Sequence, residues 1–415
     1  VPDKWNGKDG RAVKELKGVV RELHRNNIAV ILDVVVNHVS NYDWHPLKYI
    51  DRELYFKLDS KGNFLSQCCG NLLDTDNEHV LNYITESLKY WMVEYHVDGF
   101  RFDQAHLLSS ETAKHILNVL RSINPNVIVY GEAWDNRGRE FSELGWGSFN
   151  AHFRDVLRGD LHDFSKKGFL FGSYRPNENK NDLKTIITGT LWGNGGIYNT
   201  TANAINFLEV HDDYCFSDFL RLSSGQNSKN ELIKDRLEHI SLTPEIFKMN
   251  TLAALVLLTS QGIPLIHQGQ EWAHTQIIAA TDRPDPNVGK LDPNPYNKDN
   301  ETNWVNWKET EQNQSLVSYY QSLISLRKKY PELRRSSLQD IEFLDLENEF
   351  GLGYSIKDNI TIFLNGSSTE ILNAKLPSGK WLQLVNSNMV DLNGIRVVEG
   401  YINIQPTSGA VFIRT

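Results

Sequence analysis

The sequence predicts an α/β fold, a (β/α)8 barrel followed by a C-terminal antiparallel β-sandwich, and two observations support this prediction. First, helix-like and strand-like segments alternate along most of the 415 residues, which is typical of a parallel sheet covered by helices. Second, four apolar strand-like segments end in an acidic residue, and these residues are Asp33, Asp103, Glu132 and Asp212. Acidic side chains at the carboxyl ends of barrel strands commonly form catalytic sites. The pattern therefore predicts an enzyme.

The order of the expected elements follows from the spacing of apolar residues. Apolar positions that recur every three or four residues indicate helices, and short apolar runs indicate buried strands. The alternation begins with a helix over residues 10–26 and a strand over 29–36. The later elements are expected as helix 80–95, strand 97–102, helix 110–123, strand 127–130, a weak strand near 148–151, strand 203–210, helix 244–259 and strand 262–267.

The predicted barrel is incomplete, because six strands are expected here and a closed (β/α)8 barrel has eight. We expect the first two strands to be absent from this chain and an upstream polypeptide segment to complete the barrel. The alternative is an independently stable barrel of six strands, which would leave a wide parallel edge unpaired. An upstream segment would include any signal peptide, so the sequence leaves the compartment open.

The domain organisation is predicted from two changes in composition. Residues 39–78 are polar and too numerous for an ordinary strand-to-helix loop, so we expect a short inserted subdomain over the active mouth. From residue 342 onward, short alternating runs indicate antiparallel strands. We therefore expect a catalytic barrel domain over residues 1–341 and a C-terminal β-sandwich domain over residues 342–415.

The amino-acid composition limits the kinds of molecule that the chain is expected to bind. The formal net charge of −9 and the pI near 5.8 disfavour nucleic acid and anionic membrane surfaces, and the sequence holds no cluster of Lys and Arg. No apolar run approaches the ~20 residues that span a bilayer. Three cysteines, two of them adjacent, offer neither a disulfide framework nor zinc-ligand spacing. Ten Trp and sixteen Tyr are compatible with sugar binding by stacking, so a neutral substrate is expected.

The acidic strand ends belong to four short motifs in a fixed order. They read Asp33-Val-Val-Val-Asn-His38, Gly99-Phe-Arg-Phe-Asp103, Gly131-Glu132 and Phe207-Leu-Glu-Val-His-Asp212. Together they resemble the four motifs of glycoside hydrolase family 13, the α-amylase family. The flanking sequence, such as Phe149-Asn-Ala-His-Phe-Arg154, is most similar to the pullulanase and isoamylase debranching enzymes. The resemblance covers residues 5–335 and, less sharply, the C-terminal domain.

Several positions depart from the debranching pattern. Ala133 follows Glu132 where pullulanases often have Pro, and Asp213 stands where many have Asn. Gln104-Ala-His106 also differs from the usual pullulanase residues. These positions border the leaving-group side of the site. These departures leave open which glycosidic linkage is cut. They do not affect the expectation of a retaining mechanism.

The resemblance implies a retaining glycosidase that forms a covalent glycosyl-enzyme intermediate. Asp103 is then the nucleophile and Glu132 the acid/base, with carboxyl groups about 5 to 5.5 Å apart. We expect burial or a neighbouring anion to raise the pKa of Glu132. Asp212 would bind the 2- and 3-hydroxyls of the sugar most tightly in the transition state.

The same motifs supply candidate substrate-binding residues. Arg101 lies two residues before Asp103 on a strand, so both side chains are expected on the same side, where Arg101 would keep Asp103 ionised. His38 and His211 are expected to hydrogen-bond the sugar at the cleavage point. Trp134 is expected to line the site. Asp33 is interpreted as a supporting residue bonded to Arg101 or His38, since an unpaired carboxylate would be unfavourable among apolar residues.

No cofactor is expected to be required, although a structural calcium ion is considered because Asn37 matches a calcium ligand of many α-amylases. The expected substrate is an α-glucan such as starch, glycogen or pullulan, cut at α-1,6 branch linkages. The alternatives are an α-1,4-acting α-amylase or neopullulanase, and a 4-α-glucanotransferase or branching enzyme. A non-catalytic carbohydrate-binding scaffold is a further alternative. All three catalytic carboxylates are present, which disfavours the scaffold.

Overall fold

The computed structural model describes residues 10–41, 44–67, 69–280 and 285–415. The chain forms two compact units, Val1–Phe149 and Asn150–Thr415. The division between the units falls after Phe149, and the domain boundary between residues 341 and 342 stays a prediction. Residue 341 begins an antiparallel sheet inside the second unit.

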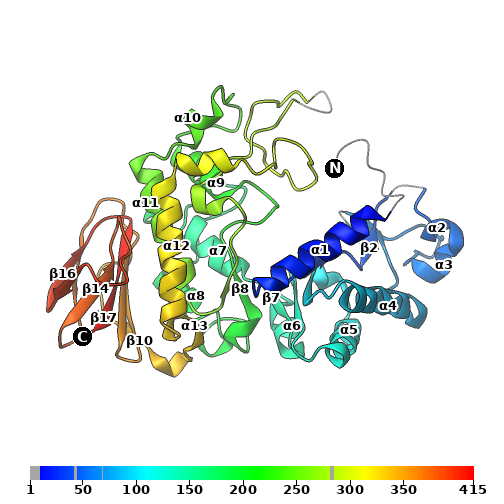
Figure 1. Cartoon of the computed structure of the whole chain (residues 1–415), viewed down its shortest axis with the longest axis horizontal. Helices are drawn as coiled ribbons and strands as arrows, with labels where there is room; N and C mark the ends of the chain where they lie inside the picture. Colours follow the sequence, from blue (N-terminus) through cyan, green and yellow to red (C-terminus); the bar gives the residue numbers. More distant parts are fainter. Residues whose placement is uncertain (1–9, 42–43, 68, 281–284) are drawn as a thin grey trace. The chain divides into compact units, whose positions relative to one another are not determined.

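The first unit is built on four parallel strands (Figure 1). They are β1 (Ile31–Val34), β5 (Gly99–Phe102), β6 (Ile128–Gly131) and β7 (Gly147–Phe149), and each pairs with the next in this order. The pairing places Asp33 opposite Arg101 and Arg101 opposite Tyr130. Because the strands are parallel, their carboxyl ends lie at one edge of the sheet. The helices between them are α1 (Arg11–Arg25), α4 (Glu78–Glu94), α5 (Ser110–Ile123) and α6 (Gly138–Leu144).

Two of these helices begin at strong capping residues. The Asn77 side chain accepts a hydrogen bond from the His79 backbone N–H at the start of α4, and Ser109 accepts one from Thr112 at the start of α5. An acidic residue follows each cap and favours the positive end of the helix dipole. The buried faces of both helices pack on the strands through Val80, Ile84, Leu88, Ala113, Ile116, Leu117 and Leu120.

The stretch predicted as an inserted subdomain holds a small sheet of its own. Strands β2 (His38–Val39), β4 (Gly70–Leu72) and β3 (Ser66–Gln67) pair antiparallel in that order. The short helices α2 (Leu47–Ile50) and α3 (Arg52–Tyr55) lie between β2 and β3. Strand β2 begins at His38, so the insertion is joined directly to a motif residue.

The second unit contains a parallel pair of strands, β8 (Ala204–Asn206) and β9 (Ile263–Pro264). Between them, α11 (Pro244–Thr259) is buried along almost its whole length, with Thr243 as its cap and Pro244 in its first turn. The other helices are α7 (Ala151–Arg158), α8 (Lys180–Ile187), α9 (Phe216–Ser224), α10 (Arg236–Ile240), α12 (Gln314–Lys329) and α13 (Glu332–Arg335).

The C-terminal part is antiparallel, as the sequence predicted. One sheet has the order β10-β11-β12-β17-β14-β15, and β13 pairs with β16 in a second sheet. Its strands are β10 (Ile341–Leu344), β11 (Gly351–Ile356), β12 (Ile360–Asn365), β13 (Leu372–Lys375), β14 (Trp381–Val385), β15 (Arg396–Val398), β16 (Tyr401–Ile404) and β17 (Ser408–Arg414).

Helix α11 explains why the antiparallel sheet does not separate as a unit. One buried cluster contains Leu255 of α11, Tyr320 of α12 and Tyr354 of β11. The Tyr354 hydroxyl also donates a hydrogen bond to the Thr259 hydroxyl, 3.2 Å away. Figure 1 shows α11 and α12 between the other helices of this unit and the C-terminal strands. The helices and the sheet therefore share one core.

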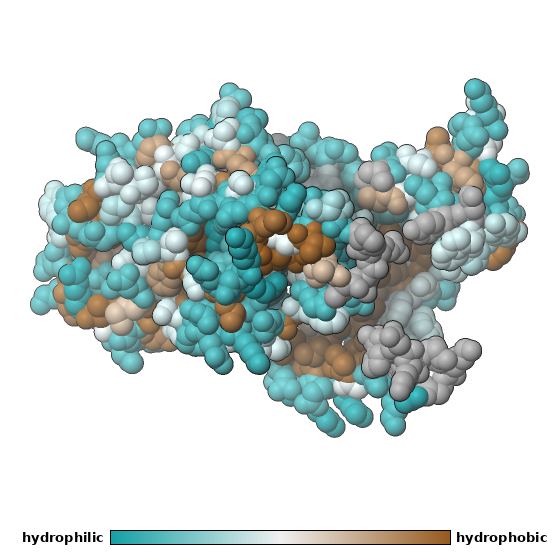
Figure 2. Space-filling model, turned by 90° about the horizontal axis from the view of Figure 1, so that it is seen from above, coloured by the Kyte–Doolittle hydropathy of each residue, from teal (hydrophilic) through white to brown (hydrophobic). Residues whose placement is uncertain are grey.

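Parallel strands occur at all six positions where the sequence predicted them. Among the described residues, none of the helices is long and apolar enough to cross a membrane. The face drawn in Figure 2 is largely hydrophilic, with hydrophobic patches between the polar areas. This surface agrees with the 23% of charged residues in the sequence.

Candidate active site

Arg101 is the centre of the site in the first unit. The residues on either side of it, Phe100 and Phe102, are fully buried on the opposite face of β5, so the alternation of the strand turns Arg101 toward the carboxyl-end carboxylates. Arg101 Nη1 donates to Asp33 Oδ1 at 2.8 Å and to Asp103 Oδ1 at 2.9 Å, and Nη2 donates to Glu132 Oε1. One guanidinium thus binds three of the predicted carboxylates.

Strand pairing brings these carboxylates together. Beyond the end of β5, the Asp103 N–H donates to the Val34 carbonyl at 3.0 Å. Beyond β6, the Glu132 N–H donates to the Phe102 carbonyl at 3.2 Å. Both acidic residues therefore continue the register of the sheet by one position. The sequence predicted their proximity for this reason, since the ends of neighbouring parallel strands meet at one edge.

The charges at this site are unequal, with three carboxylates around one cation. Burial alone would lower the pKa of the Arg101 guanidinium, but Glu132, Asp33 and Asp103 outweigh that effect and raise it. The Arg101 side chain is 6% exposed, against 23% for Asp103 and 48% for Asp33. Arg101 is therefore a permanent buried cation, and the two aspartates remain accessible from solvent.

Glu132 is held by two donors. Besides Arg101, the backbone N–H of Gln104 donates to Glu132 Oε2 at 2.9 Å. Gln104 has a left-handed backbone with φ of 39°, which aims this N–H at the carboxylate. A side chain at Gly131 would place its Cβ 2.7 Å from the Phe102 carbonyl, so the close approach of β5 and β6 requires glycine before Glu132.

Asn37 and His38 lie beside Asp103 on a neighbouring segment. The Asn37 side-chain amide donates to the carbonyls of Asp103 at 2.6 Å and Gln104 at 2.8 Å. Asn37 Oδ1 lies 2.6 Å from His38 Nδ1. Burial lowers the pKa of His38, an effect that the Asp103 charge partly offsets, so His38 is a neutral imidazole near pH 7.

The contacts of Asn37 bear on the expected calcium ion. Its side-chain oxygen, the atom that would bind calcium, is directed at His38 Nδ1, and its amide nitrogen is directed at two backbone carbonyls. This arrangement fits a bracing role for Asn37 and does not fit a calcium ligand. Calcium binding by Asn37 stays a prediction.

Aromatic rings form one wall beside Arg101. Trp134 and Phe149 stack nearly parallel with ring centroids 6.4 Å apart, and Tyr130 meets Phe149 edge to face at 5.6 Å. The Arg101 guanidinium lies 5.6 Å from the Phe149 ring centroid. Trp134 was predicted, whereas Tyr130 and Phe149 were not singled out. Both residues could have been identified from the sequence, because each lies at or near the carboxyl end of a predicted strand.

The fourth motif lies in the second unit. His211 Nε2 is 3.5 Å from Asp212 Oδ2, and the two side chains are 45% and 38% exposed. The next residue, Asp213, has φ of 63° and donates its N–H to Asn294 Oδ1 at 3.3 Å. Asp212 and His211 therefore sit on an accessible turn beyond β8. The roles of Asp212 and His211 in sugar binding stay predictions.

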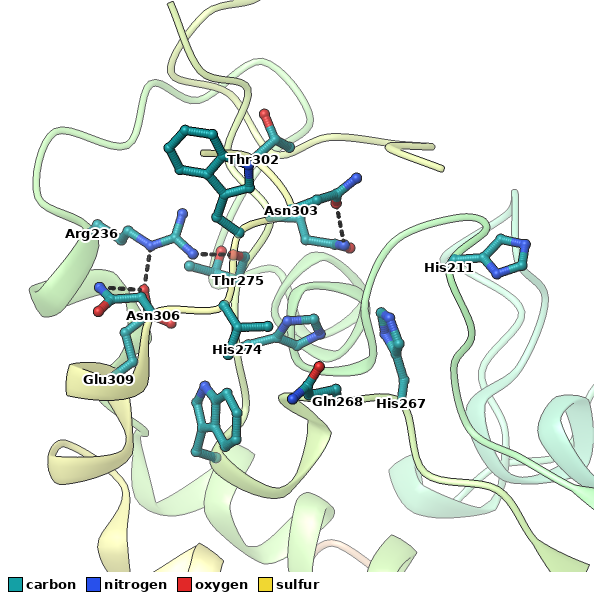
Figure 3. A pocket seen from close by; sticks show the side chains of 14 residues that line it. His211, Arg236, His267, Gln268, His274, Thr275, Thr302, Asn303, Asn306 and Glu309 are labelled. Atoms are coloured by element: carbon teal, nitrogen blue, oxygen red, sulfur yellow. Dashed lines mark hydrogen bonds and ion pairs between the residues drawn. The ribbon is translucent and has the colours of Figure 1, made fainter. Parts of the chain in front are cut away.

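A hollow of about 230 Å³ adjoins His211 in the second unit (Figure 3). Arg236 crosses one side of it, bound to Glu309 and donating to the Thr275 carbonyl at 2.8 Å. Its lining is rich in amides and aromatic rings, namely Gln268, Gln276, Asn303, Asn306, Trp272 and Trp304. Apart from His211, the sequence analysis did not identify this hollow, because its lining comes from loops without periodic patterns.

Buried charge lies directly behind that hollow. Glu209 is fully buried, with Oε1 3.1 Å from His274 Nε2 and 3.4 Å from His267 Nδ1. Burial opposes ionisation of Glu209, but the two histidines outweigh it and lower the pKa of this carboxyl. Burial likewise opposes the charge on His274, yet Glu209 raises the pKa of His274.

Comparisons with known proteins agree with the motifs. No protein-family model matches the chain. Pullulanase of Bacillus subtilis (strain 168) is 28% identical over 346 residues, which cover 79% of this chain and 44% of that protein. Glycogen debranching enzyme of Escherichia fergusonii is 26% identical over 423 residues, covering 89% of this chain and 59% of that protein. The resemblance to the debranching enzymes of the α-amylase family is confirmed.

Solved structures of the same group match nearly the whole chain. Pullulanase from Bacillus acidopullulyticus has a TM-score of 0.83 at 26% identity, covering 97% of this chain and 48% of that one. A pullulanase from Anoxybacillus sp. LM18-11, solved with maltotetraose, has a TM-score of 0.80 at 26% identity and covers 97% of this chain and 56% of that one. The chain spans about half the length of the relatives it matches.

Proposed function

We propose that this chain carries the catalytic centre of a retaining α-glucan debranching hydrolase, which cleaves α-1,6 branch linkages in starch, glycogen or pullulan. The observation that carries the proposal is the Arg101 site, where one buried guanidinium binds Asp33, Asp103 and Glu132 at the ends of adjacent strands. The similarity to pullulanases and glycogen debranching enzymes supports this choice of reaction and substrate.

Asp103 is the nucleophile in this proposal. Its Oδ1 accepts a hydrogen bond from the Arg101 guanidinium, which remains charged and holds this carboxylate at the end of β5. Asp103 attacks the anomeric carbon and forms a glycosyl-enzyme ester while the bond to the leaving oxygen breaks. Water then attacks the anomeric carbon and regenerates the carboxylate.

Glu132 donates the proton to the leaving oxygen and later accepts one from water. In the free protein both of its oxygens face donors, Arg101 and the Gln104 N–H, and these contacts favour the ionised form. To act as an acid, Glu132 must carry a proton on one oxygen. The proposal therefore requires that, when substrate binds, this oxygen faces the glycosidic oxygen instead of Arg101 or the Gln104 N–H. We expect Glu132 to be protonated when the substrate is bound.

The remaining motif residues bind the sugar in this proposal. Neutral His38 can accept or donate a hydrogen bond without adding charge, and Trp134 offers a ring face beside Arg101. Asp212 and His211 bind the sugar hydroxyls from the turn beyond β8. Asp212 needs no buried partner for this task, because its exposed carboxylate accepts hydrogen bonds from the substrate itself.

A closed (β/α)8 barrel, completed by an upstream polypeptide segment, is part of the proposal. Among the described strands, β1 pairs with β5 alone, so its other edge is open for pairing. Apolar side chains next to this edge are exposed, including Ile28 at 51% and Val35 at 53%. An open parallel edge bordered by apolar side chains favours the addition of a further strand.

The proposal is tested by analysing products after incubation with pullulan, amylopectin and linear amylose. Maltotriose from pullulan and linear chains from amylopectin support α-1,6 debranching. Short oligosaccharides from amylose favour an α-1,4 amylase, and longer rearranged chains favour a glucanotransferase. Absence of product from all three substrates, also after addition of a separately expressed upstream segment from a related pullulanase, contradicts the proposed function.

A further inference from the structure

The cluster behind the hollow brings three metal-binding side chains together from separate segments. Glu209 follows β8, His267 follows β9, and His274 follows the short helix η5 (Gln270–Trp272). One ligand atom from each, a carboxylate oxygen and two imidazole nitrogens, lies within 4.8 Å of the other two. The two imidazole rings meet edge to face, with centroids 5.2 Å apart.

The two distances from Glu209 to the histidines match a tetrahedral zinc site. Zinc binds imidazole nitrogen at about 2.0–2.1 Å and carboxylate oxygen at about 2.0–2.2 Å, so tetrahedral ligand atoms lie about 3.4 Å from one another. Glu209 Oε1 is 3.1 Å from His274 Nε2 and 3.4 Å from His267 Nδ1. The ligand atoms of the two histidines lie within 4.8 Å of each other, so movement of the imidazole rings toward the ion would complete the geometry.

Two of the metal-binding atoms, His267 Nδ1 and Glu209 Oε1, face each other in an orientation that suits a shared ion. His267 Nδ1 is buried and makes no hydrogen bond to any residue in the described part of the chain, although it faces Glu209 Oε1. The other Glu209 oxygen accepts from the Phe216 backbone N–H, which fixes the carboxylate and leaves Oε1 toward the histidines. Such outer hydrogen bonds are the usual means of orienting metal ligands.

The hollow supplies access and room for a fourth ligand. His267 and His274 both line it, and their rings point into the same space (Figure 3). Glu209 is fully buried, whereas the side chains of His267 and His274 are 25% and 13% exposed. An ion can therefore enter from the hollow, and a water molecule in the hollow can complete the coordination.

We propose that Glu209, His267 and His274 form a binding site for Zn²⁺, with water as the fourth ligand. Two imidazoles and one carboxylate form a donor set that suits zinc better than calcium or magnesium, which prefer oxygen ligands. The ion ties the segment after β8 to the segment after β9. It thereby stabilises the turn that carries His211 and Asp212, and this consequence alone rests on the proposed function.

The experiment measures zinc itself. The purified chain is stripped with a chelator, titrated with ZnCl2 by calorimetry, and its metal content is measured after dialysis. We expect one Zn²⁺ per chain and a rise in Tm that saturates at one equivalent, because a ligand that binds only the folded state stabilises it. Co²⁺ in place of Zn²⁺ is expected to give the strong visible absorption of a four-coordinate site.

Two variants and a control separate this site from adventitious binding. His267→Ala removes a partly exposed ligand, and His274→Arg removes a ligand but retains a positive partner for buried Glu209. Each is expected to weaken zinc binding more than about 100-fold, since loss of even an outer partner costs 10–100-fold. His162→Ala, an exposed histidine of the same unit, is expected to bind zinc like the wild type.

Two results would overturn the proposal. One is no zinc uptake by the stripped wild-type chain, which would leave Glu209, His267 and His274 as a buried ion pair. The other is uptake that persists unchanged in both ligand variants. Should either variant fail to fold, the Co²⁺ spectrum of the wild type decides, because weak six-coordinate absorption contradicts the site. These readouts do not require glycosidase activity, so failure of the proposed function is distinguished from failure of this one.

Discussion

The Arg101 cluster and the Glu209 cluster are built in opposite ways. In the first unit, one buried guanidinium serves three carboxylates, two of which remain accessible. In the second unit, one buried carboxylate serves two histidines. The first cluster therefore has spare acceptor oxygens that can react with or bind a sugar. The second has imidazole nitrogens that face a carboxylate, and a metal ion that displaces their protons can bind there. The excess of carboxylates in the first cluster favours a sugar as ligand, and the excess of imidazoles in the second favours a metal ion.

The largest expected effect comes from the accessible carboxylate of the first cluster. Asp103→Asn retains the size of the side chain but removes the nucleophile, so kcat on pullulan is expected to fall by at least about 10⁴-fold. Steady-state kinetics measure this change. The matched control is Asp135→Asn, whose carboxylate is 81% exposed near the site and is expected to leave kcat within twofold. Equal losses in both variants would contradict the assignment.

The next effect concerns stability. Arg101→Ala leaves three carboxylates without their shared cation, and breaking a buried ion pair costs about 3–5 kcal/mol of the free energy of unfolding. Denaturant unfolding gives the value. Arg139→Ala serves as the control, because its pair with Glu143 is exposed and is expected to contribute less than about 1 kcal/mol. A comparable loss in both would show that the buried site has no special role in folding.

A third prediction uses Asp218, a buried carboxylate of the second unit whose two oxygens both accept hydrogen bonds. Burial opposes ionisation of Asp218, but His239, Arg221 and the Gln276 N–H outweigh it and lower the pKa of this carboxyl. Its stabilising contribution is therefore present above the unfolded pKa of about 3.9 and is lost as the pH falls through the lower folded value.

Asp218→Asn is thus expected to cost about 2 kcal/mol at pH 7, with the difference from the wild type shrinking toward pH 3. Unfolding measured at several pH values checks the trend. Glu347→Gln, at an exposed position, is the control and should change little. A difference that grows on acidification would reverse the sign of the argument.

The smallest expected effect concerns the aromatic wall. Trp134→Ala removes a ring face beside Arg101 and is expected to weaken binding of a maltooligosaccharide about tenfold, or ~1.4 kcal/mol. Calorimetric titration measures the affinity. Trp192→Ala, a 54% exposed residue of the second unit, is the comparison and is expected to bind as the wild type does. An unchanged affinity in Trp134→Ala would remove this residue from the sugar site.

The two clusters also differ in how far the sequence predicted them. Asp33, Arg101, Asp103 and Glu132 lie on or next to strands with strong apolar patterns, and strand register determines which side chains meet. Their contact could therefore be predicted from the strand ends. His267 and His274 lie on irregular loops, and their approach to Glu209 depends on loop conformation that local sequence does not determine.

The compact units and the predicted domains are divided at different places. The sequence marked the change from parallel to antiparallel strands near residue 342, but that change is not the division between the compact units. Helix α11 explains the difference. Its run Leu252-Ala-Ala-Leu-Val-Leu-Leu258 is apolar on every face. Such a helix must be covered on all sides, here by neighbouring helices and by the antiparallel sheet.

The measurement that tests the central claim most directly is trapping of the glycosyl-enzyme intermediate. The chain is incubated with a fluorinated α-glucosyl fluoride, which forms the covalent intermediate faster than water releases it, and peptides are analysed by mass spectrometry. We predict one sugar per chain, attached to Asp103 in the peptide Gly99-Phe-Arg-Phe-Asp103, with no label in Asp103→Asn. A label on Glu132 or on another residue, or an unlabelled chain under conditions that label a known pullulanase, would contradict the account.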